Sequence, residues 1–338
     1  MKLTRYINNP ILSPNPANDW ESLVTTNPGA WRDEASGDVL MLYRAAGADA
    51  EHRIFLGLAR SKDGYHFERQ ADQPVLLPSI DGFDAGCVED PRIIKMGEWY
   101  YVTYATRPFP PGEYWLHEER RFKAPQCPPE FPAMLRHNAS LTGLGLTRDF
   151  KTWIRAGLMT HPEDDNRDVI LFPEKVGGKY WMMHRPANLV GEAYGLEQPA
   201  IWISSSADLM TWDRGSVLAK GELAWEGGKI GGNTPPIKTA LGWLTLYHAV
   251  GADKRYRLGA LILDADDPRI VRYRSSDWLL QPEEWYELEG YYPGVCFPCG
   301  KVVIDDTLFV YYGGADRYTC LATCSLGELL EYLRQCPV

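Results

Sequence analysis

Short apolar runs recur along the whole chain, and five of them end in an aromatic residue or a histidine. They span residues 39–43, 100–104, 180–184, 243–247 and 308–312, and they are spaced by roughly 60 to 80 residues. Each is followed by a second apolar run, at 54–58, 141–145, 201–204, 258–262 and 318–322. Short runs rich in β-branched and aromatic residues predict strands. The pattern therefore predicts a pair of strands that is repeated five times.

A shared turn follows the second run in three of the repeats. Residues 61–67, 147–153 and 206–212 each contain a hydroxyl residue, an aspartate two positions later and an aromatic residue four positions beyond the aspartate. Side-chain oxygens at this spacing can accept hydrogen bonds from turn amides, so the motif indicates a structural turn. The fourth repeat has a looser form at 264–268. In the fifth, residues 325–333 carry leucines at helical spacing and predict an amphipathic helix on the sheet edge.

Five self-similar units with several strands each are typical of a β-propeller. A length of 338 residues is compatible with two domains or with one large β unit, and the repeats favour the second. We predict an all-β fold: a five-bladed β-propeller that forms a single domain over residues 1–338, with a short C-terminal helix. Because inner strands of a propeller converge on a central channel, equivalent residues of the repeats are expected to meet there.

The composition narrows the classes of partner. A net charge of −10 argues against a general affinity for nucleic acid or for an anionic membrane surface, so an anionic ligand would need a local cluster of bases. The first ten residues lack the apolar core of a signal peptide, and no later run is long and apolar enough to cross a bilayer. We therefore expect a soluble cytoplasmic protein.

The seven cysteines are an odd number in a chain much larger than disulfide-stapled scaffolds, and we expect most of them to be buried thiols. Cys296, Cys299, Cys320 and Cys324 could be assembled into a zinc site, but the second spacing does not fit a zinc ribbon. We expect no metal and no other cofactor.

Asp90 is the most conspicuous candidate for chemistry. It precedes Pro91, and a residue before proline is pushed away from helical geometry, so we expect a loop to present its carboxylate. Glu89 and Arg92 flank it with one like and one opposite charge, which would tune its ionisation. The alternative is that Asp90 only caps a turn.

Basic residues gather where the repeats are superposed. Arg44, Arg185 and His248 each directly follow the last residue of a first apolar run, while Arg167 opens the third repeat and Tyr256 lies shortly after His248. In an acidic protein such a set suggests an anion pocket, because guanidinium groups pair with phosphate in a bidentate manner. Ion pairs with nearby carboxylates are the alternative for each arginine taken singly.

The ordered set of motifs resembles glycoside hydrolase family 130, whose members act on β-mannosides, and the resemblance covers nearly the whole chain. Small departures are Ala249, where a glycine is commoner after the histidine, and Gly314. The matching segments are residues 27–30, 42–44, 89–93, 171–175, 178–180, 184–186, 242–244, 247–248, 256–260 and 312–316.

The resemblance implies a five-bladed propeller in which Asp90 is the general acid. Phosphate would attack the anomeric carbon of a terminal mannose with inversion and release α-mannose 1-phosphate, and the acid would act by way of the mannose 3-hydroxyl. Inorganic phosphate is then a co-substrate, and a β-mannoside oligosaccharide is the partner. By the same resemblance the sugar would be held by Asn27, Arg44, Asp316 and Lys175, and phosphate by Arg167, Arg185, His248 and Tyr256.

The residue types suit this chemistry. An inverting hydrolase needs a second carboxylate to activate water, whereas phosphate arrives nucleophilic and needs one acid and a set of cations. The bases that hydrolytic family members lack are present here, which favours a phosphorylase. A β-mannosidase of the same family and a catalytically silent mannoside-binding propeller remain as alternatives. The linkage, β-1,2 or β-1,4, and the acceptor sugar stay open.

A proline-rich insertion at about 107–137 interrupts the second repeat. Because it follows the strand after Asp90, we expect it to overhang the leaving-group side, with Tyr114, Trp115 and His117 lining an acceptor subsite. A contact between subunits is the alternative.

The leucines of the last helix, Leu326, Leu329, Leu330 and Leu333, could leave an apolar surface for a partner, which would make the protein a homo-oligomer.

Overall fold

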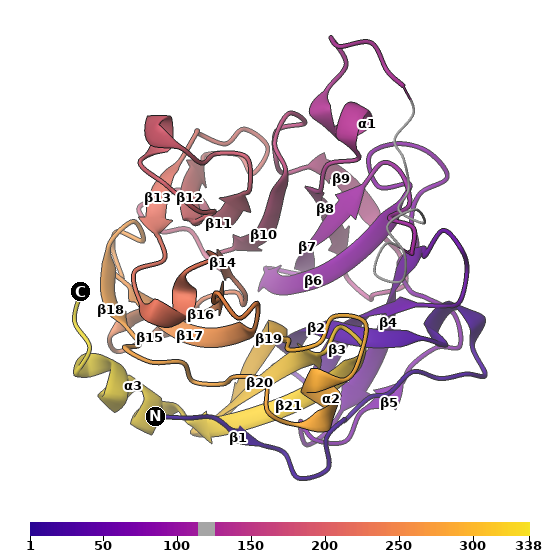
Figure 1. Ribbon diagram of the computed structural model, residues 1–338. Helices are drawn as coiled ribbons and strands as arrows, with labels where there is room; N and C mark the ends of the chain where they lie inside the picture. The colour runs from indigo at the N-terminus through magenta and orange to yellow at the C-terminus, as the bar shows by residue number, and fades with distance from the viewer. Residues whose placement is uncertain (114–125) are drawn as a thin grey trace.

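The computed structural model describes residues 1–113 and 126–338, and Figure 1 shows blades of antiparallel strands arranged around a central axis. Four sheets are formed, of which the eight-stranded one consists of two blades joined by a single parallel bridge between Ile54 and Cys87. Counting these two separately gives five blades. The predicted all-β propeller is therefore confirmed.

Each blade starts with its innermost strand. Blade 1 holds β2 (Val24–Arg32), β3 (Val39–Ala46), β4 (Ile54–Ser61) and β5 (Glu68–Arg69), and blade 2 holds β6 (Cys87–Met96), β7 (Trp99–Arg107), β8 (Leu141–Thr147) and β9 (Ile154–Leu158). Blade 3 holds β10 (Asn166–Leu171), β11 (Tyr180–Pro186), β12 (Ile201–Ser206) and β13 (Ser216–Ala219). Blade 4 holds β14 (Lys229–Gly232), β15 (Ile237–Thr239), β16 (Gly242–Val250), β17 (Tyr256–Leu263) and β18 (Val271–Arg274).

Blade 5 is completed by the two ends of the chain. It holds β19 (Cys296–Ile304), β20 (Thr307–Gly314) and β21 (Tyr318–Ser325), and its fourth strand is the N-terminal β1 (Thr4–Arg5), which pairs with β21. The two termini lie close together in Figure 1. Pairing the first strand with the last blade closes the ring by backbone hydrogen bonds and covers the outer edge of β21.

The repeated apolar runs are the second and third strands of each blade. Their side chains are buried in clusters that lie between neighbouring blades, such as the cluster of blades 4 and 5 that contains Leu246, Leu258 and Tyr312. The tyrosines that end four of the runs are fully buried, and each donates its hydroxyl to a carboxylate: Tyr43 to Glu21, Tyr104 to Asp84, Tyr247 to Glu226 and Tyr312 to Glu287. The aromatic ends of the runs therefore lock each second strand to a segment that precedes its blade.

The predicted turn motif is present in all three places. In the first, Ser61 Oγ accepts the Gly64 amide at 2.9 Å, and Asp63 Oδ1 accepts the amides of Tyr65 and His66 at 2.8 and 2.9 Å. The pairs Thr147 with Asp149 and Ser206 with Asp208 repeat this arrangement. The motif is structural, as predicted.

The C-terminal helix is present, but its apolar face is used within the chain. Helix α3 (Leu326–Arg334) begins at Ser325, whose Oγ accepts the Glu328 amide, and it buries Leu329 and Leu333 in the cluster of blades 4 and 5. Leu326 and Leu330 pack against the same cluster. Leu329 and Leu333 are therefore not available to a partner, whereas Leu326 and Leu330 are only half-buried, and a partner surface on this helix stays a prediction.

The remaining short elements are η1 (Asp19–Glu21), α1 (Ala133–His137), η3 (Glu192–Tyr194), η4 (Ala224–Glu226) and α2 (Trp285–Leu288). Tyr114, Trp115 and His117 lie outside the described residues. All seven cysteines are free thiols, and the chain as described, without 114–125, contains no group of three or more side chains that could hold a metal. No helix in that same part of the protein is long and apolar enough to span a bilayer.

Candidate active site

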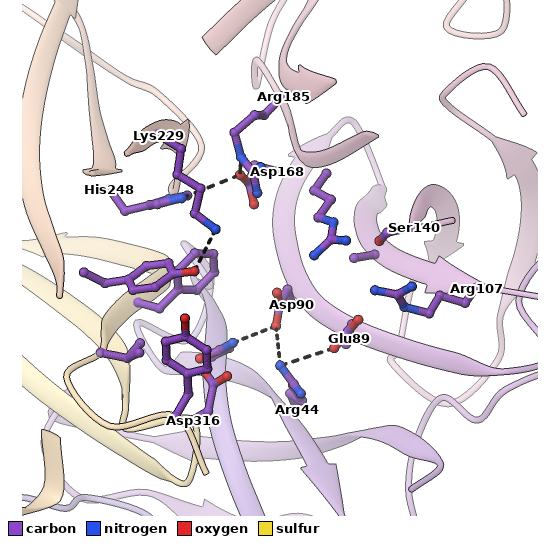
Figure 2. Close-up of a pocket in the computed structure, with 17 residues that line it drawn as sticks. Arg44, Glu89, Asp90, Arg107, Ser140, Asp168, Arg185, Lys229, His248 and Asp316 are labelled. Atoms are coloured by element: carbon purple, nitrogen blue, oxygen red, sulfur yellow. Dashed lines mark hydrogen bonds and ion pairs between the residues drawn. The ribbon is translucent and has the colours of Figure 1, made fainter. Parts of the chain in front are cut away.

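A pocket of about 290 Å³ lies where the blades converge, and all five innermost strands contribute to it. Figure 2 shows Arg44 with Glu89, Asp90 and Asp316 along one side, and Asp168 with Arg185, Lys229 and His248 along the other. The complete lining is Asn27, Arg44, Glu89, Asp90, Ala105, Arg107, Ser140, Arg167, Asp168, Arg185, Lys229, His248, Tyr256, Tyr292, Val295, Phe297 and Asp316.

A β-bulge at the same place in three innermost strands supplies much of this lining. The strand register shifts between Thr26 and Gly29, between Glu89 and Arg92 and between Arg167 and Ile170. The bulged residues Asn27, Asp90 and Asp168 have φ values of 45°, 54° and 56°. Asn and Asp tolerate this left-handed conformation better than other side chains. Asp90 is therefore presented by a bulge within β6, and the expectation of a loop is wrong.

Asp90 lies in a nearly neutral group of charges. Its Oδ1 accepts a hydrogen bond from Asn27 Nδ2 at 2.8 Å, and Arg44 Nη1 lies 3.5 Å from the same oxygen. Arg44 Nη1 also pairs with Glu89 Oε2 at 3.2 Å, so one cation is shared by two carboxylates. Burial raises the pKa of Asp90 to about 6, with Arg44 opposing the shift and Glu89 adding to it. Both contacts are made to Oδ1, which leaves Oδ2 to carry a proton.

The Arg92 guanidinium is turned to partners other than the Asp90 carboxylate, and its charge lowers the pKa of Asp90 less than that of Arg44 does. Nη1 donates to the backbone carbonyl of Asp90 at 2.9 Å, and Nε donates to the Asn233 carbonyl at 3.0 Å. Nη2 lies 3.4 Å from Asp168 Oδ1 in the next blade. Arg92 is almost fully buried, so it serves as a fixed tie between blades 2, 3 and 4.

Asp168 is the centre of the cationic side of the pocket. It accepts a hydrogen bond from Arg185 Nε at Oδ2 over 2.6 Å, and His248 Nε2 lies 3.9 Å from the same oxygen. Burial alone would raise the pKa of Asp168, but the charge of Arg185, with that of Arg92 adding to it, holds that pKa well below its usual range. Gly231 permits this packing, since a Cβ there would lie 2.3 Å from Asp168 Oδ2.

Lys229 and Arg167 complete the cationic side. Lys229 Nζ donates to Tyr256 Oη at 2.7 Å, and burial, followed by the charge of Arg185, lowers the pKa of Lys229 to about 7. Arg167 directs Nε and Nη2 to the two oxygens of Asp165, at 2.9 and 3.2 Å. The Arg167 side chain is therefore already held in place by Asp165 before an anion binds.

Most of the predicted site residues are brought together, and one is not. Asp316 follows β20 with a φ of 52°, and burial raises its pKa, with Arg44 opposing the shift. Lys175 is exposed in the turn between β10 and β11, and its Nζ lies 4.3 Å from the centre of the Tyr180 ring. Lys175 does not line the pocket, because the segment 171–175 that matches the family extends beyond the end of the inner strand β10. The residues brought together are Asn27, Arg44, Asp90, Arg167, Arg185, His248, Tyr256 and Asp316.

The lining residues that the sequence analysis gave no role include the polar side chains of Arg107, Ser140, Asp168 and Lys229. The repeats were superposed on their second strands, whereas Asp168 and Lys229 belong to the innermost strands β10 and β14. Superposing the innermost strands on their bulges would have aligned Asp168 with Asp90. This sequence pattern is short, because it consists of a single Asn or Asp near the start of the innermost strand in three blades.

Comparisons with known proteins find relatives that match almost the whole chain. The model of glycoside hydrolase family 130, described as beta-1,4-mannooligosaccharide phosphorylase, matches residues 5–127 and 131–335. The chain is 35% identical over 335 residues to a 1,2-beta-oligomannan phosphorylase of Thermoanaerobacter sp. (strain X514), covering 97% of this chain and 99% of that protein. It is 33% identical to a Beta-1,2-mannobiose phosphorylase of the same strain, covering 95% and 96%.

A solved structure is similar along its whole length. Beta-1,2-mannobiose phosphorylase from Listeria innocua, in complex with beta-1,2-mannobiose, superposes with a TM-score of 0.79 at 27% identity. The match covers 99% of this chain and 100% of that one.

Proposed function

This chain belongs to glycoside hydrolase family 130, and we propose that it breaks β-mannosides by inverting phosphorolysis, giving α-mannose 1-phosphate and the shortened sugar. The observation that carries the proposal is the division of one pocket into two halves. On one side, Asp90 has a raised pKa that suits a proton donor. On the other side of the same pocket, whose volume is about 290 Å³, lies a set of buried cations.

Asp90 is the proton donor in this mechanism. A general acid works best when its pKa lies near the working pH, and a value of about 6 keeps a useful fraction of Asp90 protonated. Asn27 and Arg44 fix Oδ1, so the proton on Oδ2 is presented to the sugar. By resemblance to the family, the proton reaches the leaving oxygen by way of the mannose 3-hydroxyl.

Phosphate takes the place that a catalytic base and water hold in an inverting hydrolase. It needs no deprotonation by a second carboxylate, so the protein's task is to place it in line with the bond and to offset its charge. Arg185, Lys229, His248 and Tyr256 lie together for this task, and Arg167 is held beside them by Asp165. Attack from this side, opposite the leaving group, inverts the anomeric carbon.

The sugar is held on the side of Asp90. Asn27, Arg44 and Asp316 line that part of the pocket, and the pairing of Arg44 with Glu89 restricts the guanidinium to one position. Gly313 makes room for Asn27, because a Cβ at that position would lie 2.0 Å from Asn27 Oδ1. These groups offer donors and acceptors to the hydroxyls of one mannose unit.

We further propose that the linkage is β-1,2. The two relatives from Thermoanaerobacter that align over nearly the whole chain are both named for β-1,2-linked mannosides. A Beta-1,4-mannooligosaccharide phosphorylase of Ruminococcus albus aligns over 57% of this chain. The full-length alignments include the segments that flank the pocket, which are the ones that select a linkage.

Incubation of the protein with β-1,2-mannobiose or β-1,4-mannobiose, each with and without inorganic phosphate, tests this function. We expect α-mannose 1-phosphate, seen by ³¹P NMR, only from the β-1,2 disaccharide and only with phosphate present. Free mannose without phosphate would instead identify a hydrolase, and binding without turnover would identify a carbohydrate-binding propeller. Sugar phosphate from the β-1,4 disaccharide alone would overturn the linkage but not the reaction.

A further inference from the structure

His248 is held in an unusual way for a residue of an anion site. Its ring stacks on Tyr256 with centroids 5.5 Å apart and contacts Phe297 at 4.9 Å, so the ring plane is fixed. Its Nδ1 lies 3.1 Å from Asn233 Oδ1. Its Nε2 is buried, makes no hydrogen bond to any residue in 1–113 or 126–338, and has Asp168 Oδ2 at 3.9 Å.

Asn233 determines which ring nitrogen carries the proton. Its Nδ2 donates to the backbone carbonyl of Pro298 at 2.7 Å. A flipped amide would set Oδ1 against that carbonyl, and two acceptors at this distance repel each other. Oδ1 therefore faces His248, and Nδ1 of His248 must be the donor. In a neutral imidazole with a proton on Nδ1, Nε2 has a bare lone pair.

The charges around His248 keep the ring neutral. Burial lowers the pKa of His248 well below its usual value, Asp168 opposes this shift, and Arg185, Lys229 and Arg92 add to it. Nε2 of the neutral His248 ring is therefore a hydrogen-bond acceptor that is surrounded by cationic hydrogen-bond donors. Such a group repels a fully deprotonated anion oxygen and favours an oxygen that carries hydrogen.

We propose that Asn233 and His248 make the anion pocket selective for a protonated oxygen, so that hydrogen phosphate is bound and sulfate is rejected. The inference rests on the proposed function, since it concerns the same phosphate site. The hydroxyl of hydrogen phosphate donates to His248 Nε2, while its other oxygens accept from Arg185 and Lys229. Lys229 lies beside the ring in Figure 2 and donates to Tyr256, and it must turn toward the anion for the buried Nε2 to be reached.

A second histidine in blade 3 supplies the matched comparison. His184 Nδ1 lies 3.0 Å from the amide of Asn166, but its Nε2 is partnered by Ser204 Oγ at 2.9 Å. His184 does not line the anion pocket. The two Asn–His pairs are both buried, and only that of blade 4 leaves Nε2 without a hydrogen bond to any described residue.

Calorimetry with inorganic phosphate and with sulfate at mildly alkaline pH tests the proposal, because the two ions then have the same charge and differ by one proton. We expect the wild-type protein to prefer phosphate by at least about tenfold, since sulfate would leave the Nε2 acceptor unpaired. Asn233→Leu should lose most of this preference by releasing the tautomer. Asn166→Leu removes the equivalent amide from blade 3 and should keep it.

NMR of protein labelled with ¹⁵N-histidine gives a readout that needs no altered binding site, with His248→Gln used only to assign the signals. We expect Nδ1 of His248 to be protonated and Nε2 to resonate as a bare nitrogen. A protonated Nε2, or equal affinity of the wild type for phosphate and sulfate, would overturn this inference and leave the proposed reaction intact. Absence of any phosphate binding would overturn both.

Discussion

Two aspartates occupy the same position in neighbouring blades and have opposite properties. Asp90 and Asp168 are the bulged residues of β6 and β10, with φ values of 54° and 56°, and both line the pocket. The pKa of Asp90 is raised by burial to about 6, whereas the charge of Arg185 outweighs burial and holds the pKa of Asp168 far below its usual range. One site therefore contains, on the same backbone geometry, a carboxyl group that takes up a proton near pH 6 and a carboxylate that stays ionised.

The difference comes from the side chains that the adjacent blades supply. Asp90 shares its nearest cation, Arg44, with Glu89, and Arg92 offers Asp90 only a bond to the backbone carbonyl. The guanidinium of Arg92 is directed to Asp168, which also binds Arg185, although the charge of Arg92 also lowers the pKa of Asp90. The bulge fixes where each carboxyl group points, and the neighbouring charges decide whether it holds a proton. Acid and anion site are thereby separated within one pocket.

Asp90→Asn should have the largest effect, because it removes the proton donor and leaves the shape of the side chain. We expect kcat for phosphorolysis of β-1,2-mannobiose to fall by about a thousandfold. Thermal stability at neutral pH should be kept or increased, since the ionised Asp90 carries a burial penalty.

An activated substrate provides the control for this variant. A dinitrophenyl β-mannoside has a leaving group that needs no proton, so its phosphorolysis should be far less affected by Asp90→Asn. An equal loss of activity on both substrates would contradict the assignment of Asp90 as the acid.

Asp168→Asn should act mainly on stability, because it leaves the buried Arg185 and Arg92 without their counter-ion. Breaking a buried ion pair from one side typically costs about 3–5 kcal/mol, which denaturant unfolding would measure. Since the pKa of Asp168 is lower in the folded state, its stabilisation is present above the unfolded pKa and is lost as pH falls toward the folded value. The difference between wild type and variant should therefore shrink in acid, and a difference that grows there would contradict this account.

Lys229→Met tests the cationic side of the comparison, with Lys175→Met as the matched control. Removal of a charged donor from the anion site should raise KM for phosphate by about tenfold to a hundredfold. Lys175 is exposed outside the pocket, so its replacement should change KM by less than about twofold. A phosphate KM that responds to Lys175 and not to Lys229 would place the anion elsewhere.

Glu89→Gln should have the smallest effect on activity, and it tests how the surroundings of Asp90 set the pKa of that residue. Glu89 contributes to the raised pKa of Asp90, so the variant should lower that pKa. Because the acid is active when protonated, kcat/KM should fall as pH rises through about 6 in the wild type, and the fall should move to lower pH in the variant. At a fixed pH above that value the loss would be about tenfold for each unit of lowering. An unchanged pH profile would remove Glu89 from the account.

The sequence was informative where a repeat had a visible period. The apolar runs ending at Tyr43, Tyr104, Tyr247 and Tyr312 predicted the strands and the number of blades, because burial between blades demands those side chains in every repeat. The site was predicted where a functional residue directly followed such a run, as Arg44, Arg185 and His248 do.

The rest of the site depends on contacts that no local pattern encodes. Asp168 and Lys229 lie on short inner strands with little apolar periodicity, and Arg92 was seen only as a neighbour of Asp90 although its charge serves the next blade. Lys175 was included with a matched segment whose far end leaves the channel. Which charge meets which carboxylate is decided by the packing of blades that are remote in sequence.

The central claim, that equivalent bulges hold one aspartate that titrates near pH 6 and one that stays ionised, can be measured directly by NMR. Protein labelled with ¹³C at the aspartate carboxyl carbons would be titrated, and the two signals assigned by their loss in Asp90→Asn and Asp168→Asn. The account predicts that Asp90 titrates near pH 6 and that Asp168 stays ionised until the protein unfolds in acid. An Asp90 signal that is already ionised well below that pH, or an Asp168 signal that titrates above Asp90, would contradict it.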